Sequence, residues 1–302
     1  MQKTTLIIDD QKAQADGLAK ALSNALPQFN FEGYSGEDEI LDAIENRFYT
    51  LAIVDIRMDD YAFDGISLVQ KIFEINPFAK VILVSAFKDE YTEDLKKVIL
   101  SGKVIDILDK KTIKKWVAEL SPKIIDYYRD LDDDPSEINS ALLQNYADAK
   151  NDTNPYTKGE KFEHFVSLLF QSFGYNDITK RYKDKSLNEV DLIIRNEITD
   201  GFLSKFGMYI LIECKNKPKD KVNKNDFIVF KSKLDNSNGL AELGIIATTG
   251  YLTWNTYHEA IRSSSSNTKI IFISNPEFER LINATDKVGV FKKLIDEQVK
   301  DN

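Results

Sequence analysis

The sequence predicts an α/β protein of two domains joined by an acidic helical linker. Short apolar runs typical of strands alternate with stretches of helical periodicity over the first 120 residues, and a second such series begins near residue 157. This alternation is typical of sheets covered by helices. The length of 302 residues is enough for two domains of ordinary size. We therefore expect domains at residues 1–120 and 157–302, with the linker at 121–156.

The first predicted domain contains five strands and five helices. The strand segments are 5–8, 29–34, 51–54, 81–84 and 104–108. The helical segments are 11–26, 36–46, 65–75, 91–100 and 112–128. Apart from the weaker segment at 29–34, the strands are apolar runs, as expected when helices bury both faces of a sheet. The pattern therefore predicts a parallel sheet with helices on both sides.

The linker and the second domain are distinguished by a change in composition. Acidic and turn-forming sequences at 132–135 and 151–155 flank one helical stretch at 136–149. An amphipathic helix at 158–173 then opens the second domain. Strands are expected at 190–195, 208–214, 244–248 and 269–273. Further helices are expected at 224–234, 253–263, 276–284 and 287–300.

Composition narrows the class of protein. The apolar fraction of 42% is sufficient for packed cores. A single cysteine excludes an intramolecular disulfide and favours a reducing, cytoplasmic setting. No secretory signal or membrane-spanning apolar stretch is found, so no membrane partner is expected. The net charge is −9, but residues 157–302 carry 22 Lys and Arg against 20 Asp and Glu. Only this part therefore suits a polyanionic partner.

Polar residues follow the predicted strands of the first domain. They are Asp9 and Asp10 after the first strand, Asp55 after the third, Ser85 after the fourth and Lys110 after the fifth. Because ligands bind at the carboxyl ends of parallel strands, these side chains are expected to converge. Clustered carboxylates repel each other unless a cation such as Mg²⁺ lies among them. A hydroxyl and a lysine can contact phosphoryl oxygens, so the set suits an aspartyl-phosphate site.

On these residues the first domain resembles the response-regulator receiver domain of two-component signalling, which has a flavodoxin-like (βα)5 fold. The resemblance implies Asp55 as the phosphoacceptor, with Ser85 and Lys110 contacting the phosphoryl group. The implied Mg²⁺ ligands are Asp9, Asp10, Asp55 and the backbone carbonyl of Arg57. A sensor histidine kinase or another phosphodonor is the implied partner. The alternative is a flavodoxin-like domain whose surface acids are incidental.

The second domain contains two carboxylates and a lysine at the ends of predicted strands. Asp191 lies in one strand segment, and Glu213 and Lys215 end another, 22 residues after Asp191. Alternate side chains share a face of a strand, so Glu213 and Lys215 point one way and Cys214 points into the core. Paired carboxylates bind Mg²⁺, which polarises a phosphate and lowers the pKa of a bound water. A nearby lysine can orient that water or stabilise negative charge.

The sequence around these residues resembles the PD-(D/E)XK nuclease superfamily, most closely its Mrr-type restriction endonuclease branch. The matching segments are 159–166, 173–175, 189–194 and 212–215. The resemblance implies a restriction-endonuclease-like α/β/α fold, with Asp191 and Glu213 as metal ligands and Lys215 as the catalytic lysine. It also implies Glu163 as a supporting acid and one or two Mg²⁺ ions, for which Mn²⁺ can substitute. The alternative is a solvated Glu–Lys ion pair with Asp191 capping a turn.

A run of lysines lies beside this pattern in the sequence. Its members are Lys217, Lys219, Lys221 and Lys224. They are expected to contact DNA phosphates, and the alternative is a solvated basic face. Trp254 and Tyr251 are able to stack on bases, but we expect them to pack in the core.

These features together predict a response regulator whose output is a metal-dependent DNA endonuclease. Cutting both strands of DNA requires two sites, so a homodimer is expected. A cleaving effector under signal control also fits defence against foreign DNA. The main alternative is a catalytically inactive nuclease-fold module that binds DNA or a protein partner under receiver control. A transcription regulator is disfavoured because no helix-turn-helix signature follows the first domain.

Overall fold

The computed structural model divides the chain into two compact units, residues 1–138 and 139–302. The described residues are 3–59, 61–85, 92–154, 156–183, 189–263 and 268–300. Tyr91 and Pro155, which lie in a predicted helix and a predicted turn, fall outside these ranges. Each unit is built on its own five-stranded sheet, so the predicted α/β class is confirmed.

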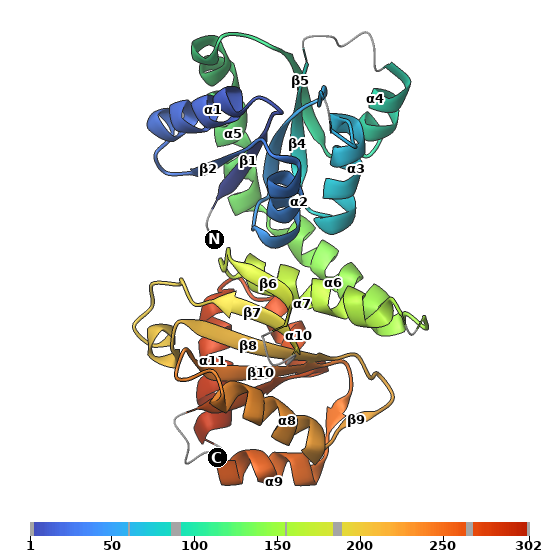
Figure 1. Ribbon diagram of the computed structural model, residues 1–302, viewed down its shortest axis with the longest axis vertical. Coiled ribbons are helices and arrows are strands. Elements are labelled where there is room, and N and C mark those ends of the chain that lie inside the picture. Colours follow the sequence, from blue (N-terminus) through green and yellow to red (C-terminus); the bar gives the residue numbers. More distant parts are fainter. Residues whose placement is uncertain are drawn as a thin grey trace. The chain divides into compact units, whose positions relative to one another are not determined.

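The first unit is a parallel sheet of order β2-β1-β3-β4-β5 with helices on both faces (Figure 1). Its strands are β1 (Thr4–Ile8), β2 (Asn30–Tyr34), β3 (Leu51–Asp55), β4 (Lys80–Ser85) and β5 (Val104–Asp109). Its helices are α1 (Lys12–Ala25), α2 (Glu37–Asn46), α3 (Gly65–Ile75), α4 (Thr92–Ile99) and α5 (Ile113–Asp133). This strand order is the flavodoxin-like arrangement that the sequence predicted.

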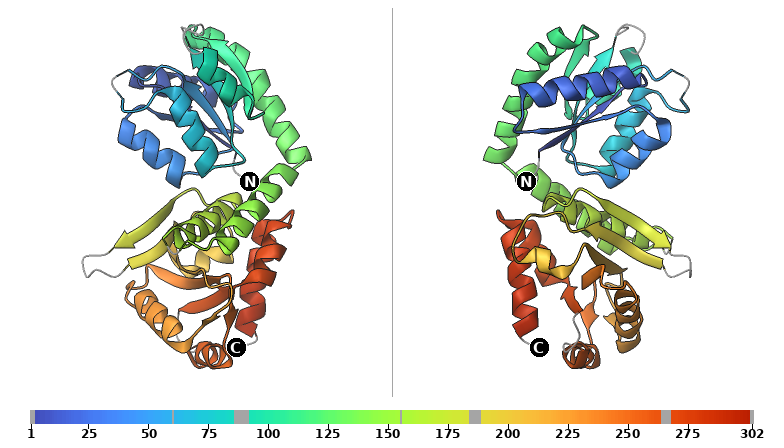
Figure 2. Two further views of the ribbon diagram at one scale, coloured as in Figure 1. Left: turned by 90° about the vertical axis from the view of Figure 1, so that its right-hand side faces the viewer. Right: turned by 60° about the vertical axis from the view of Figure 1, so that its left-hand side comes forward.

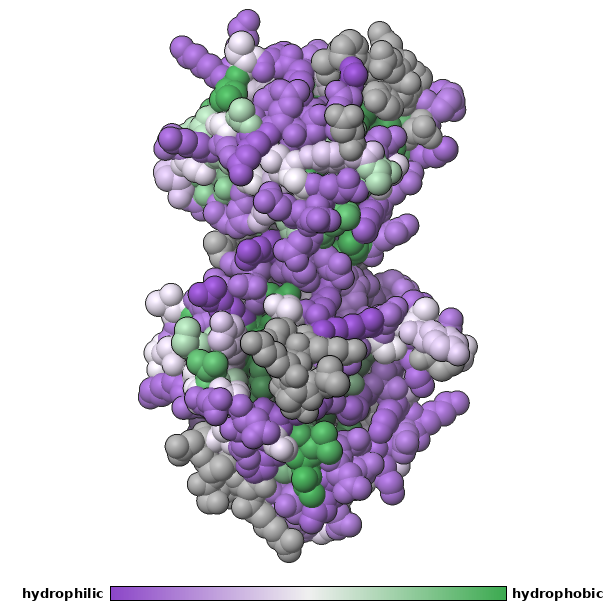
Figure 3. Space-filling model, in the orientation of Figure 1, coloured by the Kyte–Doolittle hydropathy of each residue, from purple (hydrophilic) through white to green (hydrophobic). Residues whose placement is uncertain are grey.

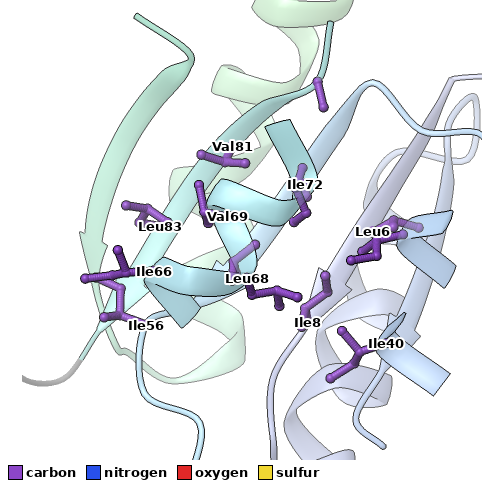
Figure 4. Close-up of a cluster of buried hydrophobic side chains, with 14 of the residues drawn as sticks. Leu6, Ile8, Ile40, Ile56, Ile66, Leu68, Val69, Ile72, Val81 and Leu83 are labelled. Carbon is purple, nitrogen blue, oxygen red and sulfur yellow. The ribbon is translucent and has the colours of Figure 1, made fainter. Parts of the chain in front are cut away.

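Two apolar clusters fill the space between this sheet and its helices. On the side of α2, α3 and α4, Leu6 and Leu83 of the strands pack with Ile40, Val69 and Ile72 of the helices (Figure 4). The cluster on the side of α1 and α5 includes Leu18, Leu22, Trp116, Leu120 and Ile124. Each fully buried side chain of this kind contributes roughly 1.5–3 kcal/mol. These contacts fix the strand ends that carry the polar residues.

Residues 121–156, predicted as a linker, contribute to both units. Helix α5 continues to Asp133, and its Tyr128 is buried in the core of the first unit. Helix α6 (Ser136–Asn151) follows, and most of it belongs to the second unit. The ring of Tyr146 in α6 lies 4.9 Å from that of Phe165. The segment therefore consists of two helices, each packed mainly within its own unit, connected by a short turn.

The second unit is a mixed sheet of order β12-β10-β8-β7-β6, in which β8 is central. Its strands are β6 (Ile178–Lys183), β7 (Glu189–Arg195), β8 (Tyr209–Lys215), β10 (Ala241–Thr248) and β12 (Lys269–Ile273). Its helices after α6 are α7 (Lys158–Ser172), α8 (Lys224–Asp235), α9 (Trp254–Ser263), α10 (Asn275–Ile282) and α11 (Lys287–Lys300). A short helix, η2 (Leu203–Phe206), and a two-stranded sheet of β9 (Lys221–Val222) and β11 (Tyr251–Leu252) complete the unit.

Helices cover both faces of this second sheet, as the predicted α/β/α layering requires (Figure 2). Phe227 and Phe230 of α8 pack with Leu211 and Ile246 of the strands on one face. On the other face, helices α6, α7 and α10 meet through aromatic contacts such as that between Phe165 and Phe278. Helix α8 therefore covers the sheet face from which the side chain of Leu211 projects.

Strands β6, β9 and β11 were not predicted from the sequence. Strand β6 carries Lys180, Arg181 and Lys183, and such a charged run favours a loop over a strand. Charged side chains are nevertheless common on edge strands, where one side of the ladder faces solvent. The short pair β9 and β11 has no apolar run of its own. None of the described helices is long and apolar enough to cross a membrane, and the face drawn in Figure 3 is mainly hydrophilic.

Candidate functional sites

An acidic pocket lies at the carboxyl edge of the first sheet. Strands β1 and β3 are in register up to Ile8 and Val54, so the residues that follow them meet at one edge. The carboxylate oxygens that Asp9, Asp10 and Asp55 offer lie within 4.8 Å of one another. Asp9 and Asp55 are each only 4% exposed. Three converging carboxylates of this kind form a donor set that fits a divalent cation such as Mg²⁺.

Lys110 joins this pocket from the end of β5. Its Nζ lies 2.5 Å from Asp55 Oδ2 and 3.1 Å from Asp9 Oδ2. Burial raises the pKa values of Asp9 and Asp55, partly offset by hydrogen bonds and by Lys110. Burial acts to lower the pKa of Lys110, but its pairing with Asp55 and Asp9 outweighs burial, so the pKa is raised. The lysine is therefore an ammonium at neutral pH.

The two remaining residues predicted for the receiver pocket lie at the same edge of the sheet. Ser85 ends β4, and Arg57 follows β3. Ser85 is fully buried, and its carbonyl accepts a hydrogen bond of 3.1 Å from the backbone N–H of Lys110. The backbone N–H of Arg57 donates to Asp55 Oδ1 at 3.3 Å. Gly65 allows α3 to begin against this edge, because a Cβ there would lie 2.1 Å from the carbonyl oxygen of Asp55. The metal-binding role of the Arg57 carbonyl stays a prediction.

A second group of charged residues lies where β7 and β8 run side by side. These strands are antiparallel, with Leu192 opposite Ile212. The N–H of Cys214 donates to Asp191 Oδ2 at 2.7 Å, which ties Asp191 to the strand that carries Glu213. Burial, followed by the negative charge of Glu213, raises the pKa of Asp191 to about 6. The structure thus brings together the two carboxylates that the sequence singled out, and their oxygens suit a divalent cation.

Glu213 is held by two lysines. The Nζ of Lys215 lies 2.7 Å from Glu213 Oε1, as alternation along the strand allows. The Nζ of Lys233, from helix α8, lies 2.9 Å from Glu213 Oε2. Burial acts to lower the pKa of Lys215, but the charge and hydrogen bond of Glu213 outweigh it and raise the pKa. Cys214, expected to face the core, is partly buried as a residue, and burial raises the pKa of its thiol.

Glu163 lies on α7 and is engaged by an arginine. Its Oε2 accepts a hydrogen bond of 2.8 Å from Nε of Arg181 on β6, and Arg181 also pairs with Glu160 at 2.8 Å. Burial raises the pKa of Glu163, and its charge contributes to the raised pKa of Asp191. Glu163, predicted as a supporting acid, is therefore near Asp191, and its own charge is balanced by Arg181.

The predicted DNA-binding lysines differ in their surroundings. Lys217 lies 3.4 Å from Asp226, and Lys224 lies 2.9 Å from Glu259. Lys219 and Lys221 are exposed. Lys221 and Lys224 line an open hollow of about 410 Å³, which the remaining residues Asn223, Asn225, Thr253, Trp254 and Asn255 complete.

The expectation that Trp254 and Tyr251 pack in the core is wrong. Trp254 is 70% exposed and Tyr251 is 57% exposed. Tyr251 is the first residue of the short strand β11, and Trp254 is the first residue of helix α9. Both aromatic rings are therefore on the surface, and that of Trp254 lines the hollow.

Sequence reasoning missed the roles of Lys233, Arg181 and Asn216 in this second group. Asn216 is buried and donates to the carbonyls of Ala149 at 2.7 Å and Lys158 at 2.6 Å. Each of the three residues contacts a partner on an element that is distant from it in the sequence. The adjacency of Asn216 to Lys215 was the one local signal available.

Family models of known proteins match a segment in each of the two units. Residues 5–119 match the family model of the response regulator receiver domain, and residues 156–282 match that of a restriction endonuclease of the Mrr type. The chain therefore belongs to the class of proteins in which a receiver domain is joined to a nuclease-like domain. The chain carries a response regulator receiver domain followed by an Mrr-type restriction endonuclease domain.

The solved structures similar to this chain include two receiver-domain structures. A CheY-like receiver protein from Methanospirillum hungatei JF-1 is 23% identical and covers 43% of this chain and 99% of its own, with a TM-score of 0.36. The receiver domain of the Francisella response regulator 1452 is also 23% identical and covers 42% of this chain and 99% of its own, with a TM-score of 0.33. A comparison with curated proteins gave no match.

Proposed function

We propose that this chain is a response regulator in which phosphorylation of Asp55 controls a Mg²⁺-dependent DNA endonuclease. The observation that carries the proposal is the grouping of Asp191, Glu213 and Lys215 at the ends of β7 and β8. A phosphoacceptor pocket on the same chain supplies the control. Carboxylates near a lysine on adjacent strands are the groups that metal-assisted phosphodiester hydrolysis needs.

In the receiver, an oxygen of Asp55 attacks the phosphorus of the donor, a sensor histidine kinase or a small phosphodonor. The phosphoryl group then passes to Asp55 as the donor's leaving group departs. Lys110 is cationic and lies 2.5 Å from Asp55, which supports its pairing with a phosphoryl oxygen. The hydroxyl of Ser85 is the proposed second contact. Asp9, Asp10, Asp55 and the carbonyl of Arg57 are the proposed ligands of Mg²⁺, which would neutralise the phosphoryl charge.

In the second unit, Asp191 and Glu213 are the proposed ligands of one or two Mg²⁺ ions, or of Mn²⁺ in their place. The bound ion supplies polarisation of the scissile phosphate and a lowered pKa for an attacking water. The raised pKa of Lys215 keeps it an ammonium, so it donates to a phosphate oxygen or orients water and does not act as a base. Glu163, which is paired with Arg181, is the proposed supporting acid beside Asp191.

DNA binding is proposed over the lysine run and the hollow beside it. Exposed Lys219 and Lys221 provide contacts to phosphates, as do Lys217 and Lys224 when they leave their present acidic partners. The exposed ring of Trp254 supports stacking against a base. Contacts of this kind make binding strongly dependent on salt concentration.

The link between the two functions is proposed to run through α6. The last turn of this helix is held by Asn216, the residue next to Lys215, through the carbonyl of Ala149. The amide oxygen of Asn216 is fixed in turn by Thr249 at 2.9 Å. A shift of α6 relative to the sheet therefore acts directly on the strand end that carries Lys215.

Cleavage of a supercoiled plasmid in Mg²⁺ or Mn²⁺ tests the nuclease proposal. The wild-type chain should nick or linearise the plasmid, and Lys215→Ala should lower the rate at least about 10²-fold, as loss of an electrostatic stabiliser does. Lys231→Ala is a matched control, because Lys231 pairs with Asp235 on its own helix. If wild type and Lys215→Ala are equally inert with and without phosphodonor, the chain is a binding module that does not cleave.

Two further parts of the proposal have their own tests. A homodimer would supply the two sites that double-strand cleavage needs, and sedimentation with and without phosphodonor measures the association. Defence against foreign DNA would require the cleavage site. Cells expressing the wild-type chain should therefore resist phage infection better than cells expressing Lys215→Ala.

A further inference from the structure

Lys233 reaches the second site from helix α8, which covers one face of the sheet. Its Nζ lies 2.9 Å from Glu213 Oε2, while Lys215 takes Oε1 at 2.7 Å. Glu213 is only 7% exposed and the side chain of Lys233 only 16%. Both oxygens of this carboxylate are thus already bound by ammonium groups. A cation that binds Glu213 must either share these oxygens with ammonium groups whose positive charge repels it, or displace one of them.

The two lysines differ in how easily they can leave. Lys215 shares a strand face with Glu213, so the backbone keeps it near the carboxylate whatever its side chain does. Lys233 reaches Glu213 from α8 through a long, flexible side chain. It also lines a hollow of about 440 Å³ bordered by Tyr209, Leu211 and Asn236, which gives the side chain room to move.

A purely structural bridge between α8 and β8 is a weak account of this contact. Removing a lysine and a carboxylate from water costs several kcal/mol, and buried ion pairs often stabilise no better than apolar residues of the same size. Helix α8 already packs through Phe227, Phe230 and Leu234. Lys231 on the same helix pairs with Asp235 instead and needs no partner in the sheet.

We propose that Lys233 is a positioning residue that occupies Glu213 Oε2 while the site lacks a divalent cation and must release it for a cation to bind. The proposal rests on the proposed nuclease function, in which Glu213 is a metal ligand. Lys233 would thereby set the cation concentration at which the site becomes loaded. It would also balance the charge of Glu213 when no cation is present.

Calorimetric titration of Mn²⁺ into the full chain tests this role without relying on cleavage. All proteins carry Asp9→Asn and Asp10→Asn, so that the receiver pocket does not contribute to the measured binding. Lys233→Met and Lys233→Gln should each bind Mn²⁺ about 10-fold more tightly, equivalent to about 1.4 kcal/mol. Lys233→Arg restores the competing cation and should stay within about 3-fold of the parent, as should Lys231→Ala.

The outcomes separate this proposal from the nuclease proposal. Unchanged or weaker Mn²⁺ binding in folded Lys233→Met and Lys233→Gln overturns the role of Lys233, whether or not the chain cleaves DNA. Thermal unfolding identifies any variant that has lost its fold. If one of Lys233→Met and Lys233→Gln is unfolded, the Mn²⁺ affinity of the other tests the proposal. Tighter binding in an inert chain supports the role of Lys233 and counts against the nuclease activity alone. An Mn²⁺ affinity that is unchanged in Asp191→Asn shows that the ion binds elsewhere, and this result also overturns the role of Lys233.

Discussion

The carboxylate of Asp191 should make the second unit less stable at neutral pH than it would be with an amide at that position. Its pKa is raised from 3.8 to about 6, first by burial and then by the charge of Glu213. The folded state therefore binds this proton more tightly than the unfolded state. The contribution of Asp191 to stability is greatest below pH 3.8, declines as the pH rises to about 6, and is constant above that value.

The size of this effect follows from the shift. A difference of about 2 pKa units corresponds to about 3 kcal/mol, because one unit is 1.36 kcal/mol. Asp191→Asn removes the charge and keeps an oxygen that can accept the hydrogen bond from Cys214. In the absence of a divalent cation, the variant should therefore be more stable than wild type at pH 7, by up to about 3 kcal/mol. The gain should disappear near pH 4.

Urea unfolding followed by hydrogen exchange of peptides from β7 and β8 measures this difference for the second unit separately. Glu197→Gln is a matched control, because it removes one carboxylate from the same unit in the loop after β7. A destabilised Asp191→Asn, or a gain that is the same at pH 4 and pH 7, would refute the reasoning. Either result would show that burial and the charge of Glu213 do not strain this carboxylate.

Three other predictions concern the receiver, the coupling and DNA binding. Incubation with a small phosphodonor and Mg²⁺ should add one phosphoryl group by intact mass, and Asp55→Asn should remove the adduct; an adduct that survives excludes Asp55 as the acceptor. Asn216→Ala loses its hydrogen bonds to Ala149, Lys158 and Thr249, so the free energy of unfolding of the second unit should fall by about 1–3 kcal/mol. Cleavage by this variant should also respond less to phosphodonor, and an unchanged response in the folded variant rules out this route. Trp254→Ala should weaken DNA binding by about 1–3 kcal/mol in fluorescence anisotropy, whereas Tyr156→Ala, which removes another exposed aromatic ring, should not; equal effects would argue against stacking.

The sequence was most informative where local pattern decides structure. The apolar runs of β1, β3 and β4 and the alternation along β8 are set by burial, so their positions could be read from residue type. The polar residues at the strand ends followed, because parallel strands end at the same edge. That is why Asp9, Asp55 and Lys110 could be singled out together without a structure.

Contacts made by tertiary packing were beyond this kind of reasoning. Lys233 and Lys231 look alike in the sequence of α8, and only the position of the helix over β8 selects Lys233 for Glu213. Strand β6 was missed because pairing with β7 outweighs the low strand preference of a charged run. Trp254 was assigned to the core by residue type, although its helix begins where the apolar core ends.

The most direct test of the central claim is plasmid cleavage by the full chain in Mg²⁺, with and without a small phosphodonor. The account predicts that phosphodonor changes the cleavage rate of wild type, that Asp55→Asn removes this change, and that Lys215→Ala removes cleavage under both conditions. A cleavage rate that is the same with and without phosphodonor, in a chain shown by mass to carry the phosphoryl group, would contradict control through Asp55. Cleavage that persists in Lys215→Ala would contradict the assigned site.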